Sequence, residues 1–221
     1  MPLLAARAVL LDMDGTLVDS DAAVERSWLG WAARYGLDGA YVYGISHGRQ
    51  GHETMADLLP GRPREQNLAE ARELAAAEAA DIAGVIPVPG ASGFLTALAC
   101  VPHALVTSAT DAIARARMGA VGLPLPPVMV TADQVSAGKP APEGFLKAAA
   151  ALGVDPVDCV AFEDSAAGLA AARAAGVRVI GVGKRALAYQ AELHVRDFND
   201  LRLELTPGGA VHISVRSGQP E

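Results

Sequence analysis

The sequence is poor in the residues that mark secreted and nucleic-acid-binding proteins. Among 221 residues there are 2 cysteines, and 18 lysine and arginine residues stand against 25 aspartate and glutamate residues. Cys100 and Cys159 lie in apolar surroundings without a Cys-x-x-Cys spacing, so we expect buried free thiols in a reducing compartment. The formal net charge of −7 and the lack of a basic cluster argue against nucleic acid as a partner.

Long apolar runs are also missing. None approaches the roughly 20 residues of a membrane span, and the N-terminus lacks the pattern of a signal peptide. We therefore expect a cytoplasmic protein with no membrane partner. Hydrophobic residues make up 51% of the chain but aromatic residues only 5%, which predicts a core of alanine, valine and leucine. The length suits one large domain, or one domain with a modest insertion.

The first apolar run ends in charge. Residues 8–11 are typical of a central parallel strand, and Asp12 and Asp14 follow directly, before Gly15. Open α/β sheets bind ligands at the carboxyl ends of their strands. Carboxylates two residues apart share a face of an extended chain, where a hard cation could bridge them. An Asp-Gly turn at a strand end would account for the same residues without any chemistry.

Helical patterns alternate with short apolar runs from Ala91 onward, which is typical of a parallel sheet with helices on both faces. The expected helices are 91–99, 112–120, 142–152 and 166–175, and the expected strands are 104–107, 128–131, 159–162 and 177–182. Weaker strands at 201–205 and 211–215 predict a hairpin at a sheet edge. The last six residues are expected to be disordered.

Residues between the first strand and Gly90 carry helical patterns without a strand. Three helices are expected, at 21–35, 50–59 and 63–82, with 86–90 as the return hinge. The predicted fold is therefore α/β. It has a Rossmann-like parallel sheet core of residues 1–19 and 90–221, with an inserted α-helical cap domain of residues 20–89.

Three later segments carry further candidate chemistry. Thr107 and Ser108 follow an apolar strand, where hydroxyls and backbone N–H groups can cradle phosphate, although capping a helix is the ordinary role of such residues. Lys139 stands in a loop restricted by a glycine and two prolines. Glu163 and Asp164 end another apolar run, and adjacent buried carboxylates repel each other unless a cation lies between them.

These four segments, in this order, resemble the four motifs of the haloacid dehalogenase superfamily. Its phosphatase members read Asp-x-Asp-Gly-Thr after the first strand, as residues 12–16 do here, whereas members that act on carbon–halogen bonds lack the second Asp. The third motif resembles Gly-Lys-Pro-x-Pro at 138–142. The resemblance covers roughly residues 8–182 and implies a Mg²⁺-dependent phosphatase that works through an aspartyl-phosphate.

The resemblance implies a role for each motif residue. Asp12 would be the nucleophile, and Asp14 the general acid and base. Ser108 and Lys139 would hold the phosphoryl oxygens, with Thr107 as the fallback for Ser108. The implied Mg²⁺ ligands are Asp12, the backbone carbonyl of Asp14, Asp164 directly, and Glu163 either directly or through water. Thr16 would shape the loop around the substrate.

The segment around residues 46–53 resembles the His-Gly-Lys/Arg-Gln loops of sugar and polyol phosphatases. His47, Gly48, Arg49 and Gln50 are therefore expected to bind substrate, with side chains that hydrogen-bond sugar hydroxyls; a polar turn exposed to water explains this loop equally well. Arg115-Ala116-Arg117 also resembles bacterial sugar phosphatases. The expected partner is a small phosphorylated metabolite, a sugar or polyol phosphate, and the protein is expected to be a monomer or weak homodimer.

Other activities leave different traces. Phosphonatases use a cap lysine, but no lysine precedes Lys139. β-Phosphoglucomutase-like enzymes generally carry a histidine where this chain has Val24 and an arginine where it has Gly51. A β-phosphoglucomutase-like enzyme and a phosphoglycolate phosphatase stay open as alternatives, as does a protein that binds a phosphometabolite without catalysis.

Overall fold

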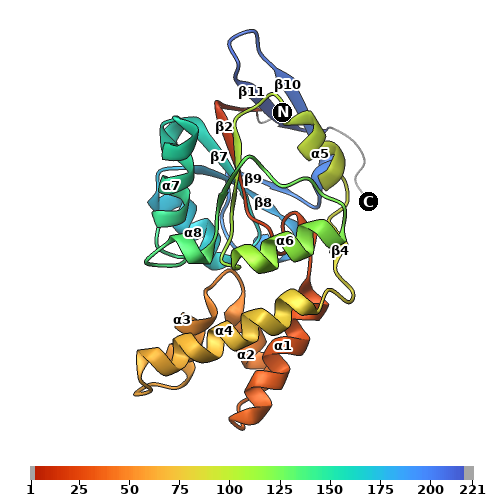
Figure 1. Ribbon diagram of the computed structural model, residues 1–221. Coiled ribbons are helices and arrows are strands. Elements are labelled where there is room, and N and C mark those ends of the chain that lie inside the picture. Colours follow the sequence, from red (N-terminus) through yellow and green to blue (C-terminus); the bar gives the residue numbers. More distant parts are fainter. Residues whose placement is uncertain (1–2, 217–221) are drawn as a thin grey trace.

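Residues 3–216 are described by the computed structural model, which places a twisted parallel sheet above a group of four helices (Figure 1). The sheet has six parallel strands in the order β6-β5-β2-β7-β8-β9. Their bounds are β2 (Ala8–Leu11), β5 (His103–Val106), β6 (Val128–Val130), β7 (Cys159–Glu163), β8 (Arg178–Val182) and β9 (Leu193–Val195). The predicted α/β fold with a parallel sheet is confirmed.

Helices cover both faces of this sheet. They are α5 (Ala91–Ala97), α6 (Asp111–Ala120), α7 (Glu143–Leu152), α8 (Ala166–Ala174) and the short α9 (Gly183–Ala186). Successive side chains of a strand point to opposite faces. In β2, Val9 and Leu11 pack in one cluster with Phe94 of α5, whereas Leu10 packs in a second cluster with Phe145 of α7. This two-sided burial explains why β2 is apolar at every position.

The four cap helices have a hydrophobic cluster of their own. They are α1 (Asp21–Arg34), α2 (Gly39–Ser46), α3 (Gly51–Leu58) and α4 (Arg64–Ala80), packed around Trp28, Trp31, Val42 and Met55. The sequence did not predict α2, because two glycines and a run of aromatic and β-branched residues weaken its helical signal. Its N-terminus is capped by Asp38, whose carboxylate accepts the N–H groups of Ala40 and Tyr41.

The cap is connected to the core by two neighbouring chain segments. The short strand β3 (Val18–Asp19) leads into α1, and β4 (Ile86–Pro87) returns from α4; the two pair antiparallel. This pairing brings the entry and the exit of the cap together.

The C-terminal hairpin forms, in a small sheet separate from the parallel one. Strands β10 (Leu201–Leu205) and β11 (Val211–Val215) join β1 (Leu3–Ala6) in a separate antiparallel sheet of order β1-β11-β10. The sequence did not single out β1 as a strand, so its pairing with β11 was not foreseen. The expected disorder of the last six residues falls, apart from Arg216, outside the described residues.

Two smaller expectations have mixed outcomes. Both cysteines are free, but Cys100 is exposed and only Cys159 is buried, which corrects the expectation for Cys100. Within residues 3–216, no helix has both the length and the apolar character needed to cross a membrane.

Candidate active site

Three neighbouring strands bring the candidate residues together. Strands β5, β2 and β7 are adjacent and parallel, so their carboxyl ends meet at one edge of the sheet. Asp12 directly follows β2, and its N–H donates to the carbonyl of Phe162 in β7 at 3.0 Å. Thr107 follows β5, and Glu163 ends β7. This edge is the one that faces the cap (Figure 1).

A cluster of buried carboxylates occupies this edge. Asp12, Glu163 and Asp164 each offer an oxygen, and these three oxygens lie within 4.8 Å of one another. Burial, then the charge of Glu163, raises the pKa of Asp12 well above its ordinary value. The same two causes raise the pKa of Asp164 to about 7. A set of oxygen donors that repel one another in this way fits a hard divalent cation such as Mg²⁺.

Lys139 supplies a positive charge inside the cluster. Its Nζ donates to Asp12 Oδ1 at 2.6 Å and to Glu163 Oε1 at 2.5 Å. Burial opposes the charge on Lys139, but Asp12 and Glu163 outweigh burial and raise its pKa, so Lys139 is charged. The other Glu163 oxygen accepts the N–H groups of Asp164 and Ser165, both at 2.9 Å, and the Ser165 hydroxyl at 3.0 Å. Both oxygens of Glu163 are therefore engaged within the protein.

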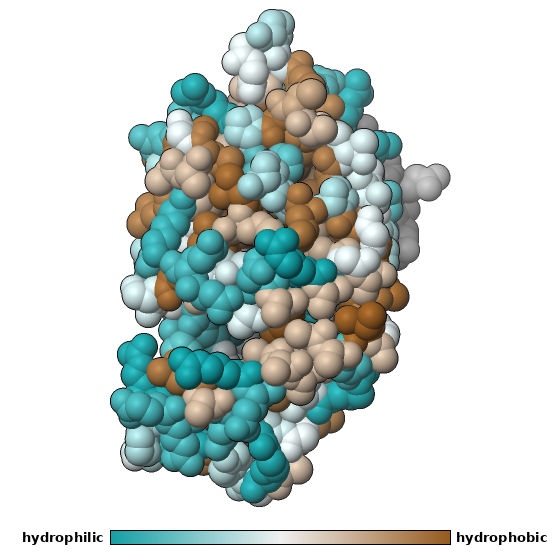
Figure 2. Space-filling model, in the orientation of Figure 1, coloured by the Kyte–Doolittle hydropathy of each residue, from teal (hydrophilic) through white to brown (hydrophobic). Residues whose placement is uncertain are grey.

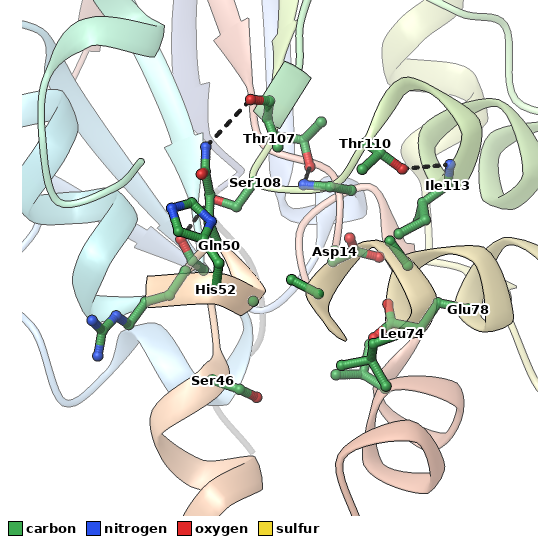
Figure 3. A pocket seen from close by; sticks show the side chains of 18 of the residues that line it. Asp14, Ser46, Gln50, His52, Leu74, Glu78, Thr107, Ser108, Thr110 and Ile113 are labelled. Carbon is green, nitrogen blue, oxygen red and sulfur yellow. Dashed lines mark hydrogen bonds between the residues drawn. The ribbon is translucent and has the colours of Figure 1, made fainter. Parts of the chain in front are cut away.

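Asp14 has a different environment. Its Oδ1 accepts from Ser20 Oγ at 2.6 Å and from Arg117 at 2.8 Å, whereas its Oδ2 has no partner among residues 3–216. Its side chain is 27% exposed and faces the cavity (Figure 3). The turn after it needs Gly15, which has a φ of 82° and where a Cβ would lie 2.2 Å from Asp164 Oδ2. Thr16 is fully buried in the same loop.

The two hydroxyl residues after β5 take different positions. The Ser108 hydroxyl donates to the backbone carbonyl of Gly48 in the cap at 2.8 Å. Thr107 is 6% exposed, and its hydroxyl accepts the Ala109 N–H at 3.1 Å. Both residues line the cavity. The Ser108 hydroxyl is engaged with the cap, whereas Thr107 directly follows the end of β5.

A cavity of about 520 Å³ lies between core and cap. Figure 3 shows Gln50, His52 and Ser46 on one side of it and Asp14, Leu74 and Glu78 on the other. Apolar side chains of α1 and α4 contribute to its lining: Val24, Trp28, Leu68 and Leu74. On the face seen in Figure 2, much of the outer cap surface is hydrophilic.

The expected cap loop lies against the core and does not extend into water. His47, Gly48, Arg49 and Gln50 all line the cavity. The His47 ring packs 4.5 Å from Tyr43, and burial, then Arg185, lowers its pKa to about 4, so its imidazole is neutral near pH 7. Gln50 is 6% exposed, with Nε2 at 3.5 Å from the Ala132 carbonyl. Arg49 pairs with Asp57 at 2.7 Å.

Two arginines that join core and cap carboxylates were assigned no role from the sequence. Arg117 donates to Asp14 and to Glu78 of α4, each at 2.8 Å. Arg185 donates to Asp164 and to Asp21 of α1. Arg117 belongs to the Arg115-Ala116-Arg117 segment that resembles bacterial sugar phosphatases. Its partners Asp14 and Glu78 lie 103 and 39 residues away along the chain, so no local pattern showed the pairing.

The chain is similar to several known proteins. Residues 6–176 match the family model described as haloacid dehalogenase-like hydrolase. Hexitol phosphatase A of Escherichia coli (strain K12) is 42% identical over 80% of this chain and 82% of its own. Validoxylamine A 7'-phosphate phosphatase of Streptomyces hygroscopicus subsp. limoneus is 34% identical over 89% of this chain and 96% of its own. The crystal structure of β-phosphoglucomutase from Clostridium difficile, 23% identical, has a TM-score of 0.78 and covers 89% of this chain and 93% of that one, which shows the shared fold.

The fold and the site thus define a hydrolase with a parallel sheet and an acidic site at its carboxyl edge. The chain belongs to the haloacid dehalogenase-like hydrolase family. The expected resemblance is confirmed, and so is the expected enzyme class, a hydrolase that acts on phosphoric monoesters.

Gly168 of α8 offers a test of how tightly Glu163 must be held. A Cβ at Gly168 would lie 1.7 Å from Glu163 Oε1, and this carboxylate cannot move without breaking its contacts with Lys139 and Ser165. We expect Gly168→Ala to destabilise the protein by about 1–3 kcal/mol in urea unfolding. Its phosphatase kcat should fall at least tenfold, because Lys139 loses one of its two anchors.

Gly93→Ala is the matched control. Gly93 is also helical, and nothing lies within 4 Å of the Cβ it would gain. This change should leave kcat intact and be neutral, or stabilising by about 0.5–1 kcal/mol. Equal activity and stability in the two variants would contradict the tight packing around Glu163.

Proposed function

We propose that this protein is a Mg²⁺-dependent phosphatase that hydrolyses small sugar or polyol monophosphates through an aspartyl-phosphate on Asp12. The observation that carries the proposal is the pairing of two unlike carboxylates at one cavity. Asp12 is buried in an acidic cluster beside Lys139, and Asp14 presents an unpartnered oxygen within residues 3–216. One carboxylate is thus suited to nucleophilic attack and the other to proton transfer.

The chain's own residues suit the metal as well. Asp12, the backbone carbonyl of Asp14, and Asp164 would hold Mg²⁺ directly. Because both Glu163 oxygens are engaged within the protein, the contact of Glu163 would run through water. When bound, the metal would neutralise charge on the phosphoryl oxygens. Lys139 and a hydroxyl after β5, Ser108 or Thr107, would hold the remaining oxygens.

The reaction has two steps. An Asp12 oxygen forms a bond to phosphorus while the bond from phosphorus to the leaving oxygen breaks, and that oxygen takes the proton of Asp14. In the second step a water oxygen bonds to phosphorus, and the bond between Asp12 and phosphorus breaks. Asp14 receives the proton of that water, so both carboxyl groups return to their starting forms.

The cavity supports a sugar-sized or polyol-sized leaving group. Its volume of about 520 Å³ lies in the ordinary range of small-molecule sites. The neutral imidazole of His47 can donate and accept hydrogen bonds, and the Gln50 amide can do both. Relatives at 42% and 34% identity are named for a hexitol phosphate and for validoxylamine A 7'-phosphate. Val24 and Gly51 line the cavity, so the histidine and arginine of β-phosphoglucomutase-like enzymes have no counterparts at these positions.

We also propose a division of the chain into core and cap, a cellular compartment and an oligomeric state. We place residues 1–19 and 90–221 in the core and 20–89 in the cap, because the paired β3 and β4 lie at these two crossings. We place the enzyme in the cytoplasm as a monomer or weak homodimer, and the two free cysteines suit a reducing compartment.

Asp12→Asn tests the nucleophile. The amide removes the attacking carboxylate at nearly constant shape, so phosphate release from p-nitrophenyl phosphate and from a panel of sugar and polyol phosphates should fall at least 10³-fold. Activity near the unmodified level in a folded Asp12→Asn protein would contradict the assignment.

The metal and the substrate class are tested on the unmodified enzyme, which should lose its activity in EDTA and regain it with Mg²⁺. A preference for phosphoglycolate in kcat/KM would overturn the substrate class.

Gln50→Ala tests the role of the cap loop. Losing one hydrogen bond worth about 0.5–1.5 kcal/mol should lower kcat/KM for the preferred sugar or polyol phosphate about 2- to 13-fold. Hydrolysis of p-nitrophenyl phosphate should change little, because the nitrophenyl group of this substrate carries no hydroxyl groups for Gln50 to bind. Gln66→Ala, at an exposed position of α4 outside the cavity, is the control and should change neither substrate. Equal losses on both substrates would argue against recognition of hydroxyls by Gln50.

A further inference from the structure

Arg117 is among the most deeply buried charged side chains of the described protein. It lies on α6 of the core, is 2% exposed, and lines the cavity beside Asp14. Its two terminal nitrogens donate to different parts of the molecule: one to Asp14 Oδ1 and the other to Glu78 Oε2 of cap helix α4, each at 2.8 Å. A single guanidinium thus joins the expected general acid to the cap.

The geometry at Asp14 distinguishes its two oxygens. Arg117 and the Ser20 hydroxyl both donate to Oδ1, so this oxygen is fixed from two directions. Oδ2 has no partner within residues 3–216 and belongs to a side chain on the cavity wall. Holding one oxygen sets the direction of the other, so the carboxyl group is aimed before a substrate arrives.

Burial makes this arrangement costly unless it has a use. Removing one partner from a buried ion pair is typically strongly destabilising, while apolar replacements of the whole set are often neutral for stability. Glu78 is 8% exposed, so the bridge from Asp14 through Arg117 to Glu78 is largely withdrawn from water. A fold could fill this space with aliphatic side chains, yet it places an arginine beside the acid.

We infer that Arg117 is the positioning residue of the general acid. It fixes Oδ1 of Asp14 so that Oδ2 meets the leaving oxygen of the substrate, and Glu78 completes this arrangement when the cap lies against the core. The inference rests on the proposed phosphatase function and assigns a role beyond it. Arg117 itself does not touch the reacting atoms; it acts through Asp14.

This role has a signature that a structural role lacks. An alkoxide leaving group of a sugar or polyol phosphate needs a proton as it departs, whereas p-nitrophenolate leaves readily without one. A misdirected Asp14 should therefore slow the first kind of substrate far more than the second. General loss of structure would slow both alike.

The experiment compares kcat/KM for glycerol 3-phosphate and p-nitrophenyl phosphate in the unmodified enzyme and in Arg117→Ala. We expect a fall of about 100-fold or more on glycerol 3-phosphate and of less than about 10-fold on p-nitrophenyl phosphate, within the range of general acid catalysis. Arg62→Ala is the matched control. Arg62 pairs with Glu70 at 2.5 Å inside the cap and away from the cavity, so the ratio of the two substrates should stay unchanged.

Two further single variants, Arg117→Lys and Glu78→Gln, keep the test decisive if Arg117→Ala folds poorly in circular dichroism. Arg117→Lys keeps the charge but cannot donate to Asp14 and Glu78 from two terminal nitrogens. The ratio of kcat/KM on glycerol 3-phosphate to that on p-nitrophenyl phosphate should therefore lie between those of the unmodified enzyme and Arg117→Ala. Glu78→Gln leaves Arg117 in place and should shift the ratio in the same direction by a smaller factor. In the double variant Asp14→Asn/Arg117→Ala, loss of Arg117 should cost nothing further on glycerol 3-phosphate, since the two residues act as a unit.

The contradicting results are distinct. Equal falls on both substrates in folded Arg117 variants, or additive losses in the double variant, would overturn the positioning role. A lack of activity of the unmodified enzyme on both substrates would instead overturn the proposed function, and the inference with it.

Discussion

The contact of Lys139 with Asp12 and Glu163 is the interaction on which the site depends. Three carboxylates meet where neighbouring parallel strands end, and burial there raises the pKa of Asp12 and of Asp164. Lys139 makes this arrangement tolerable by donating to two of the three at 2.6 and 2.5 Å. The strands determine the positions of the three carboxylates, and Lys139 offsets part of their negative charge.

The cap takes part in the same electrostatic arrangement. Arg117 joins Asp14 to Glu78, and Arg185 joins Asp164 to Asp21, so each arginine bridges a core carboxylate and a cap carboxylate. The hydrogen bond from the Ser108 hydroxyl to the Gly48 carbonyl is a further contact between core and cap. Cap position and site charge are therefore coupled, and a cap that opened would leave buried charges without partners.

The sequence predicted the features that depend on neighbouring residues in the chain, namely the strands and the polar residues that follow them. Three of the four candidate motifs are a short strand followed by polar residues, and the sheet needs only parallel order to bring Asp12, Thr107 and Glu163 to one edge. Helix α2 was missed because its composition is a poor helical signal and tertiary packing around Val42 decides its structure.

The bridging arginines were out of reach for another reason. The partners of Arg117 and Arg185 lie up to 164 residues away, and only the docked cap shows that they meet. The direction of the Ser108 hydroxyl towards the cap is likewise a product of packing between the two parts. The sequence thus predicted the candidate reacting groups but not the arginines that contact them.

The central claim is that Asp12 carries the phosphoryl group, and trapping it is the most direct test. A single turnover with ³²P-labelled glycerol 3-phosphate, quenched in acid within milliseconds and digested to peptides, should give label on the peptide that contains Asp12. Hydroxylamine should release that label, as expected of an acyl phosphate. Full phosphate release with no label on that peptide at any quench time, or label on a different peptide, would contradict the account.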